Sequence, residues 1–524
     1  MNAERRDFLW LTALGLAGGA LAAGLDAAAA ANAGATFDIR SFGASGDGKT
    51  IDSPAINRAI AAAAAAAGGV VRFPAGTYAC YSIRLASFVT LLFEPGATIL
   101  AAPPPGYDAA ESNAPWEAYQ DFGHNHWHNS LIWGENLHDV ALLGPGRIWG
   151  RGLSRGEWPE AGLPPADAPG AGDKAIALKR CRNVILRDFS ILAGGHFGIL
   201  ATGVDNLAID GISIDTNRDG MDIDACRNVQ ISNCRVNSPL DDGICLKSSF
   251  ALGEARATEN VTISGCHVTG YKLGTVFDGA FEPLAAAMRQ VPTGRIKLGT
   301  ESNGGFKNIS ISNCTFESCR GFALETVDGG ALEDISFTGV TMRDIRNAPF
   351  FLRLGARLRG PPGITVGTLR RIIISDVVCD APANDMPAII SGIPRHPIED
   401  VTISDVYLVQ RGGVPTEPAA IDPPEEAKDY PEPSRFGRLP AQALFVRHAR
   451  NLEISHLEIA SKTPDARPVC WLSDVDGAAF TRFKPPSNAQ GAAFLLQDTR
   501  RFRIAASPPV PDTTLDTIHQ KRLP

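Results

Sequence analysis

The chain has 524 residues, of which 44% are hydrophobic and 20% charged, and its formal net charge is −8 at pH 7. This much apolar material excludes a disordered chain, and the acidic balance argues against a general nucleic-acid-binding surface. The length is about three to four times that of an ordinary domain, so several domains are expected unless a repeated unit extends one core. The 53 glycines and 37 prolines indicate many short strands and turns rather than a helical bundle.

The N-terminus has the pattern of an export signal. Arg5-Arg6 precede an apolar run from Leu9 to Leu25, and small residues follow at Ala31-Asn32-Ala33. Paired arginines ahead of such a run predict twin-arginine export, with residues 1–33 removed. A membrane anchor is the alternative, but the run is rich in Ala and Gly and no second long apolar segment follows. We therefore expect a periplasmic or secreted bacterial protein without stable membrane insertion.

The first predicted element after the signal is a short helix. An alanine run from Ala59 to Ala67 follows Ser53-Pro54 and ends at Gly68-Gly69. Proline suits the first turn of a helix, and serine suits its N-terminal cap. This segment is expected to be one short capping helix.

A phrase of Asn, an apolar residue, any residue and then Ile or Leu recurs along the chain. Full copies begin at Asn183, Asn206, Asn228, Asn260 and Asn308, with weaker copies at Asp334, Asp400 and Asn451. The spacing indicates a unit of about two dozen residues with loop insertions. One such unit cannot bury its own apolar face, whereas coils stacked about 4.8 Å apart can. The repeat predicts an all-β, single-stranded parallel β-helix over residues 37–500, followed by a C-terminal tail over residues 501–524.

The same register predicts which residues are structural. Six residues after each full-copy Asn stands a residue expected in one interior row: Phe189, Ile212, Cys234, Cys266 and Cys314. These cysteines are interpreted as packed thiols, although an exported protein permits disulfides. The Asn residues themselves are interpreted as a ladder of turn residues.

The register also gathers acidic residues. Asp219 and Asp241 stand thirteen residues after Asn206 and Asn228, and Asp242 follows directly. Three carboxylates therefore fall at one turn of neighbouring coils. Clustered carboxylates do not ionise independently, so one can keep a proton and act as general acid while another polarises water. This arrangement suits glycoside hydrolysis, although solvated turn residues or a calcium site would also account for it.

Two cations are predicted beside the acids. The alternation of the segment from Arg295 to Leu298 puts Arg295 and Lys297 on the outer surface of the same sheet. A guanidinium group suits the fork of a carboxylate, so this pair predicts recognition of an acidic sugar.

At these residues the chain resembles glycoside hydrolase family 28, the polygalacturonase family. The resemblance rests on Asn217-Arg218-Asp219-Gly220, Asp241-Asp242-Gly243 and Arg295-Ile296-Lys297, in that order. It is supported by Phe73-Pro74-Ala75-Gly76-Thr77-Tyr78, by Gly299-Thr300-Glu301-Ser302 and by a late stretch from Tyr430 to Gly437. The resemblance covers about residues 37–500.

The resemblance implies a right-handed, pectin-lyase-like β-helix that needs no cofactor or metal and hydrolyses its substrate by single displacement with inversion. It implies that Asp241 is the general acid and that Asp219 with Asp242 activates water. Arg295 and Lys297 would hold the substrate carboxylate, and Asn217 would contact the substrate. The implied partner is an acidic plant cell-wall polysaccharide or oligosaccharide, such as pectin, polygalacturonan or rhamnogalacturonan.

The sequence departs from the family pattern at one signature. Gly-His-Gly is absent, and the corresponding region is taken as Gly270-Tyr271-Lys272-Leu273-Gly274. We expect Tyr271 or Lys272 to replace the missing contacts in substrate binding. The acids are retained, so the departure favours an exo-acting or branched-pectin enzyme over ordinary endo-cleavage of polygalacturonan.

Other sequence features leave alternatives open. His124, His126 and His128 alternate, so on a strand they would share one face, but no fourth metal ligand is evident. The proline-rich segment 414–440 is interpreted as a long surface loop. The rival functions are a calcium-dependent pectate lyase, with Arg295 or Lys297 as base, and a non-catalytic carbohydrate-binding β-helix.

Overall fold

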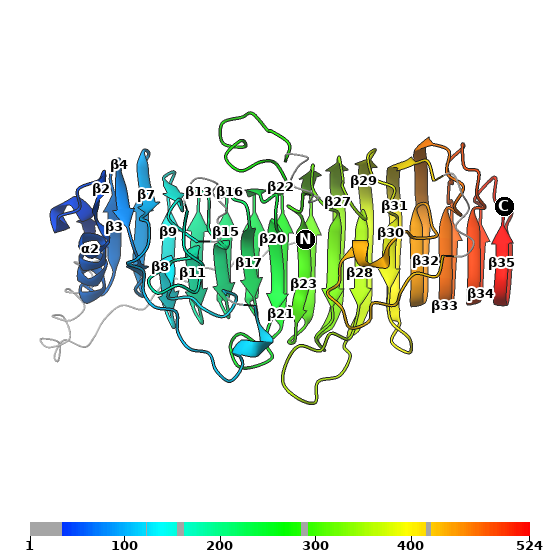
Figure 1. Cartoon of the computed structure of the whole chain (residues 1–524), viewed down its shortest axis with the longest axis horizontal. Helices are drawn as coiled ribbons and strands as arrows, with labels where there is room; N and C mark the ends of the chain where they lie inside the picture. Colours follow the sequence, from blue (N-terminus) through cyan, green and yellow to red (C-terminus); the bar gives the residue numbers. More distant parts are fainter. Residues whose placement is uncertain (1–33, 122, 155–161, 285–291, 415–420) are drawn as a thin grey trace, which may run out of the picture.

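The computed structural model describes residues 34–121, 123–154, 162–284, 292–414 and 421–524. Short strands follow one another along a single long axis, from the blue N-terminal coils to the red C-terminal ones (Figure 1). The predicted signal peptide, residues 1–33, lies outside the described residues.

The strands stack into three parallel ladders, and successive strands along the chain belong to successive ladders. The first ladder, which carries the site described below, contains β5 (Ile83–Arg84), β8 (Ser130–Glu135), β11 (Lys174–Lys179), β14 (Phe197–Thr202), β17 (Asp219–Asp224), β20 (Ile244–Ser248), β23 (Ile296–Ser302), β26 (Phe322–Thr326), β28 (Phe350–Leu354) and β30 (Ala388–Ser391). The second contains β1 (Thr36–Asp38), β3 (Gly69–Phe73), β6 (Val89–Phe93), β9 (His138–Leu143), β12 (Arg182–Arg187), β15 (Asp205–Asp210), β18 (Arg227–Ser232), β21 (Thr258–Ser264), β24 (Phe306–Ser312), β27 (Ala331–Arg343), β29 (Thr368–Ala381) and β31 (Ile398–Gly412). The third contains β2 (Asp47–Ile51), β4 (Gly76–Cys80), β7 (Ala97–Ala101), β10 (Arg147–Trp149), β13 (Ser190–Leu192), β16 (Ser213–Asp215), β19 (Arg235–Asn237), β22 (His267–Thr269) and β25 (Thr315–Glu317).

Toward the C-terminus the ladders merge. β32 (Leu444–Thr463) pairs with both β30 and β31, and β33 (Cys470–Thr481) and β34 (Phe494–Ala505) extend the stack. The predicted parallel β-helix is therefore confirmed.

The repeated phrase sets the register of the second ladder. Val184, Leu207, Val229, Val261 and Ile309 are consecutive partners in neighbouring coils, and all are buried. Alternate side chains of a strand point to opposite faces, so the apolar positions of the phrase fill the interior while the polar ones face outward. Each coil thus buries its neighbour's apolar face, which no isolated unit could do.

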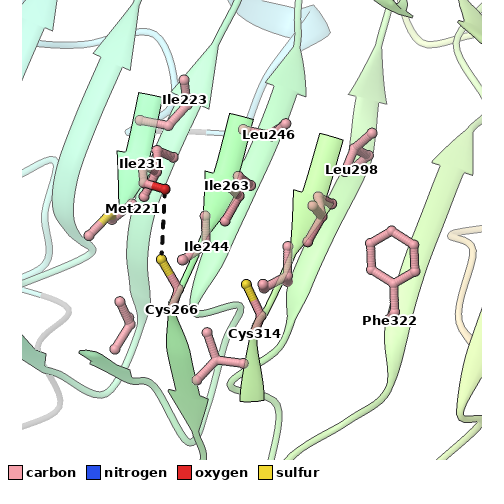
Figure 2. Close-up of a cluster of buried hydrophobic side chains, with 14 of the residues drawn as sticks. Met221, Ile223, Ile231, Ile244, Leu246, Ile263, Cys266, Leu298, Cys314 and Phe322 are labelled. Atoms are coloured by element: carbon pink, nitrogen blue, oxygen red, sulfur yellow. Dashed lines mark hydrogen bonds between the residues drawn. The ribbon is translucent and has the colours of Figure 1, made fainter. Parts of the chain in front are cut away.

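The predicted interior row is confirmed. Phe189, Ile212, Cys234, Cys266 and Cys314 are all at most 2% exposed. Figure 2 shows Cys266 and Cys314 among the interior side chains, with the Cys266 thiol donating to the carbonyl of Ile231 at 3.9 Å. All ten cysteines are buried and free, so their role is packing rather than cross-linking.

The asparagines form the predicted turn ladder. Each Nδ2 donates to the Oδ1 of the asparagine one coil earlier, at 2.9 Å from Asn206 to Asn183, 3.1 Å from Asn228 to Asn206, 3.0 Å from Asn260 to Asn228 and 2.8 Å from Asn308 to Asn260. All five have a positive φ between 53° and 57°. Asparagine tolerates this left-handed conformation better than most residues, which explains its recurrence at this turn.

The predicted capping helix is α2 (Ser53–Ala65), which begins after Asp52 and carries Pro54 in its first turn. Its buried face, with Ile56 and Ile60, packs against β1, β3 and β5 at the N-terminal end of the stack (Figure 1). Three short 3₁₀ turns, η1 (Ile39–Phe42), η2 (Glu117–Tyr119) and η4 (Pro433–Phe436), lie in connecting segments.

Residues 501–524, predicted as a C-terminal tail, contain the end of one strand and a further strand. β34 continues to Ala505, and β35 (Thr513–Leu523) pairs with it in antiparallel register. A strand that reverses direction forms no new coil, so it lacks the repeated phrase that marks the others. It covers the last edge of the stack, which would otherwise present unpaired backbone groups.

Candidate active site

The candidate site lies where three neighbouring strands of the first ladder begin. β17 begins at Asp219, and Asp241-Asp242-Gly243 lead directly into β20. The coils are joined by hydrogen bonds from Gly220 N–H to the Asp242 carbonyl at 3.0 Å and from Gly243 N–H to the Arg295 carbonyl at 2.9 Å. A Cβ on Gly220 would lie 2.4 Å from the Gly243 carbonyl oxygen, so only glycine fits after this acid.

The three predicted carboxylates meet. Asp219, Asp241 and Asp242 each offer an oxygen within 4.8 Å of the others. Asp219 and Asp242 are buried, whereas Asp241 is partly exposed and its carboxylate pairs with Arg218 at 2.9 Å. The predicted juxtaposition on neighbouring coils is thus present in the structure.

Asp242 is held in its ionised form. Its Oδ1 accepts from Arg295 Nε at 2.9 Å, and its Oδ2 lies 3.1 Å from Lys297 Nζ. Burial by itself would raise the pKa of this carboxyl, but the charges of Lys297 and Arg295 outweigh it and hold the pKa well below the ordinary value.

Asp219 is in the opposite state. Burial is the main cause that raises its pKa well above the ordinary value, and the neighbouring Asp222 and Asp241 add to the rise. Burial also raises the pKa of Asp222, to about 7, although the charge of Lys247 acts to lower it. Burial thus favours the protonated form of Asp219, whereas the two cations favour the ionised form of Asp242, and acid–base chemistry needs such a division.

Glu325, on β26, lies behind Arg295 and Lys297. It is fully buried, with one carboxylate oxygen 3.6 Å from Arg295 Nη2 and the other 3.5 Å from Lys297 Nζ. Burial raises the pKa of Glu325, and the charges of Lys297 and Arg295 act against that rise.

A segment far along the chain covers the two cations. Lys297 Nζ donates to Tyr430 Oη at 3.2 Å and lies 5.5 Å from the centre of the tyrosine ring. Glu432 lies 3.9 Å from Arg295 Nη2 and accepts from Arg320 Nη1 at 2.8 Å. As a result Arg295 and Lys297 are only 1% and 3% exposed.

A cavity of about 450 Å³ opens beside these groups. Its lining residues are Leu240, Asp241, Asp242, Thr293, Arg295, Lys297, Arg320, Arg346, Asn347, Met386, Tyr430, Glu432 and Ser434. Its volume is within the range of about 300–1,000 Å³ typical of ligand sites. A larger hollow of about 620 Å³ follows the asparagine ladder on another face, but it is lined by residues of β9, β12, β15 and β18 and lacks an acid–base pair.

On the N-terminal side of the acids, large side chains cover the first ladder. Phe197 is the register partner of Asp219 on the preceding coil and is fully buried. The rings of His196 and His124 cover it, with centroids 4.1 Å and 4.9 Å from that of Phe197. One coil further, Lys174 and Asp173 form a fully buried ion pair. Among the described residues the cavity therefore extends from the acids toward the C-terminal coils.

Two family models match parts of the chain. A model described as rhamnogalacturonase A/epimerase, pectate lyase-like, matches residues 36–110, and a right-handed β-helix region matches residues 169–281. The predicted right-handed, pectin-lyase-like fold is confirmed. A probable polygalacturonase of Vitis vinifera is 24% identical over 396 residues, which cover 70% of this chain and 73% of that protein. The chain is a relative of the polygalacturonases.

Solved structures agree with this relationship. A family 28 exopolygalacturonase of Yersinia enterocolitica superposes with a TM-score of 0.58 at 18% identity, covering 88% of this chain and 78% of that one. A hyperthermoactive exopolygalacturonase of Thermotoga maritima superposes with a TM-score of 0.55 at 20% identity, covering 72% of this chain and 87% of that one. The resemblance to glycoside hydrolase family 28 is confirmed: the chain is polygalacturonase-like in sequence, and it shares the fold of these exopolygalacturonases.

The structure corrects the position assumed for the missing Gly-His-Gly signature. β20 pairs directly with β23, so no separate coil of this ladder lies between the Asp242 and Arg295 coils. Residues 270–274 instead begin an excursion between β22 and β23.

Two predicted substrate-binding residues lie away from the cavity. Lys272 is exposed and pairs with Glu282 at 2.7 Å, and the backbone of Tyr271 is bound by the side chain of Asn237. Neither residue lines the cavity. Asn217 is buried next to the acids, and its carbonyl accepts from Leu240 N–H at 2.9 Å, which ties the Asp219 turn to the Asp241 turn.

The three alternating histidines do not share a site. His124 Nδ1 lies 3.0 Å from Lys247 Nζ, in a buried group with Asp222. His126 bonds to Glu117, and His128 bonds to Glu135. The segment is a turn rather than a strand, so alternation does not put the rings on one face.

Sequence reasoning did not assign Glu325, Arg320, Arg346 or Glu432 to the site. Glu325 could have been found, because Ala323 pairs with Lys297 and Glu325 stands two residues further on the same face. Arg320, Arg346 and Glu432 come from turns and from the late segment, whose paths the repeated phrase does not determine. The stretch from Tyr430 had been interpreted as a surface loop and instead forms a wall of the cavity.

No helix among the described residues is long and apolar enough to cross a membrane.

Proposed function

We propose that this chain is an exported glycoside hydrolase that cleaves an α-linked, galacturonic-acid-containing polysaccharide or oligosaccharide by single displacement with inversion. The observation that carries the proposal is the meeting of Asp219, Asp241 and Asp242, with the pKa of Asp219 raised and that of Asp242 lowered, in a chain related to polygalacturonases. Export is proposed from the twin arginines of residues 1–33, through the twin-arginine route to the periplasm or medium.

The proposed reaction uses each carboxyl group according to its surroundings. Asp241 faces the cavity and protonates the glycosidic oxygen as its bond to the anomeric carbon breaks. Asp242 accepts a proton from the water whose oxygen forms the new bond to that carbon. Asp219 lies within 4.8 Å of Asp241, close enough to pass it a proton. Because burial disfavours the ionised form of Asp219, we assign water activation to Asp242, which the two cations keep ionised.

Removal of the acid tests the proposal. We expect Asp241→Asn to lower reducing-sugar release from pectic substrates by at least about 100-fold, because no proton reaches the leaving group. Asp188→Asn, at an exposed turn, is the matched control. Circular dichroism and thermal melting should show both variants folded like the parent. Unchanged turnover by Asp241→Asn would contradict the assignment.

The stereochemistry provides an independent test. The closest oxygens of the acids lie within 4.8 Å, whereas the carboxyl groups of inverting glycosidases are about 6.5–9.5 Å apart. Room for the water therefore requires the side chains to turn apart when substrate binds. We expect proton NMR to show the β-anomer as the first product of an α-linked substrate. An α-anomer formed first would contradict single displacement.

We further propose that the enzyme acts from one end of its substrate. This proposal is supported by the filled ladder on the N-terminal side, where Phe197 and the rings of His196 and His124 leave no continuation of the groove among the described residues. An exo-acting enzyme should release short products while solution viscosity falls slowly. A rapid fall in viscosity before short products appear would instead indicate endo action.

A calcium-dependent lyase is the main rival enzyme. Against it, the carboxylates that would bind the ion already pair with cations, at 2.9 Å for Arg218 with Asp241 and for Arg295 with Asp242. A divalent ion would have to enter against these positive charges. A lyase yields unsaturated, ultraviolet-absorbing products and stops with EDTA, whereas we expect saturated products and no effect of EDTA. A non-catalytic carbohydrate-binding β-helix would bind pectic oligosaccharides without forming any product.

A further inference from the structure

Every cation around the cavity is already opposed by a carboxylate of the chain itself. Arg218 pairs with Asp241, Arg320 with Glu432 and Arg346 with Asp344, while Arg295 and Lys297 share Asp242 and Glu325. Asp219 adds no positive charge in either protonation state. The wall therefore has no positive charge in excess, although the sequence alone predicts two free cations.

The hydrogen-bonding capacity of Lys297 is also used up. An ammonium group has three donors. Its neighbours are Asp242 at 3.1 Å, Glu325 at 3.5 Å and Tyr430 Oη at 3.2 Å. A substrate carboxylate could approach Lys297 only by displacing one of these partners from a group that is 3% exposed.

Arg295 cannot present a carboxylate-binding fork. Its Nε donates to Asp242, and its Nη2 lies between Glu325 and Glu432 at 3.6 Å and 3.9 Å. Nη1 is buried and has no hydrogen-bond partner among the described residues. Recognition of a carboxylate by two parallel N–H groups needs two accessible nitrogens, whereas here one is buried and Glu325 and Glu432 flank the other.

A buried carboxylate without its own cation is strongly disfavoured. A uronic acid over Arg295 and Lys297 would bring one more negative charge to a wall whose cations are all paired. A neutral sugar would bring none, and its hydroxyls could contact Tyr430, which lines the cavity and is 44% exposed.

We propose that the subsite over Arg295 and Lys297 binds a neutral sugar, and that Glu325 and Glu432 are specificity-determining residues that occupy the places a uronic carboxylate would need. This inference rests on the proposed function and narrows its substrate to an acidic polysaccharide in which neutral sugars alternate with galacturonic acid.

Glu432 is the better position for a test, because it lies on the cavity rim with 17% of its side chain exposed, whereas Glu325 is fully buried. Glu432→Gln keeps the shape of the side chain and releases Arg320, and Arg295 in part, from a fixed negative charge. Glu426→Gln, on the same late segment but outside the cavity lining, is the matched control.

The experiment measures binding, so that it does not depend on turnover. Dissociation constants of an oligogalacturonide and of an alternating neutral–acidic oligosaccharide of equal length are determined by calorimetry in the Asp241→Asn background. We expect the alternating ligand to bind at least about tenfold more tightly. We expect Glu432→Gln to move this ratio about tenfold toward the oligogalacturonide, and Glu426→Gln to leave it unchanged.

Equal or tighter binding of the oligogalacturonide by the Asp241→Asn protein would overturn the inference, even if Glu432→Gln failed to fold. An unchanged ratio of the two dissociation constants in a folded Glu432→Gln variant would show that Glu432 does not determine specificity. Hydrolysis of the two oligosaccharides by the wild-type enzyme is measured in parallel. If neither is cleaved while the binding ratio holds, the proposed function fails and the binding preference stands.

Discussion

At the scale of single residues, two aspartates on adjacent coils show how surroundings decide chemistry. Asp219 and Asp242 are both buried, yet burial with like charges nearby raises the pKa of Asp219, whereas Lys297 and Arg295 lower that of Asp242. The same side chain thus serves to keep a proton in one position and to accept one in the other. The two cations act here on the carboxylate that we propose activates water, a role that their sequence motif alone does not reveal.

The low pKa of Asp242 should be visible in the pH profile of the enzyme. Asp242 must be ionised to accept a proton. Removal of Lys297 takes away a charge that lowers the pKa of Asp242, so burial then raises this pKa. We expect Lys297→Met to move the acid limb of kcat/KM to higher pH by at least about one unit, equivalent to about 1.4 kcal/mol. Lys307→Met, at a half-exposed position on β24, should leave the limb in place. An acid limb that stays unchanged in Lys297→Met would show that Asp242 does not set it.

The raised pKa of Asp219 has a consequence for stability. Between its unfolded and folded pKa values this group binds more protons in the folded state, so its contribution to stability falls as pH rises through that window. Asn cannot ionise and escapes this loss. We therefore expect Asp219→Asn to lose activity while its melting temperature, relative to that of the parent, improves from pH 5 to pH 8. A relative melting temperature that declines over this range would contradict the assignment.

At the scale of elements, the asparagine ladder should stabilise the coils without taking part in catalysis. Asn228 donates to Asn206 and accepts from Asn260, whereas Asn308 makes one ladder bond among the described residues. Both have nearly the same positive φ, so replacement by Ala strains them alike. We expect Asn228→Ala to lower the free energy of unfolding by about 1 kcal/mol more than Asn308→Ala, corresponding to one further hydrogen bond.

Chemical denaturation of both ladder variants gives this difference, and turnover by the folded protein is the control. We expect kcat to be unchanged in each variant. Equal losses of stability would mean that the backbone conformation, rather than the side-chain hydrogen bonds, selects asparagine at these turns.

The repeated phrase was sufficient to predict the register of the coils. The register in turn predicted the buried interior thiols and the proximity of Asp219 to Asp241 and Asp242. It could not show that the chain leaves the stack after β22 and returns at β23, so Tyr271 and Lys272 were expected beside the acids and instead lie outside the cavity lining. Insertions change the path of the chain without changing the phrase on either side, which limits any count of coils from sequence.

At the scale of the whole molecule, the two ends of the stack are closed by different elements. α2 covers the N-terminal coils, and β35 covers the edge of β34. We expect a chain ending at Ala505 to associate or aggregate, because the exposed strand edge offers unpaired backbone groups to other molecules. Light scattering coupled to size-exclusion chromatography checks this, with the full chain as reference. A monodisperse truncated protein would show that the edge is protected by other means.

Partners of the site from distant parts of the chain were beyond sequence reasoning. The contact of Lys297 with Tyr430 joins residues 133 positions apart, and no periodicity connects them. The net charge of the site was equally hidden, since it depends on which carboxylates come to lie beside which cations.

The late segment around Tyr430 and Glu432 belongs to a different part of the chain from the clustered carboxylates, and this separation bears on evolution. The carboxylates proposed for bond cleavage belong to consecutive coils between Asp219 and Asp242, whereas much of the wall that would contact the sugar comes from residues beyond 320. Connecting segments on a solenoid tolerate exchange, because each coil relies mainly on its neighbours for packing. Mutations in the segment around Tyr430 and Glu432 can therefore change which polysaccharide is accepted while the inherited chemistry stays intact.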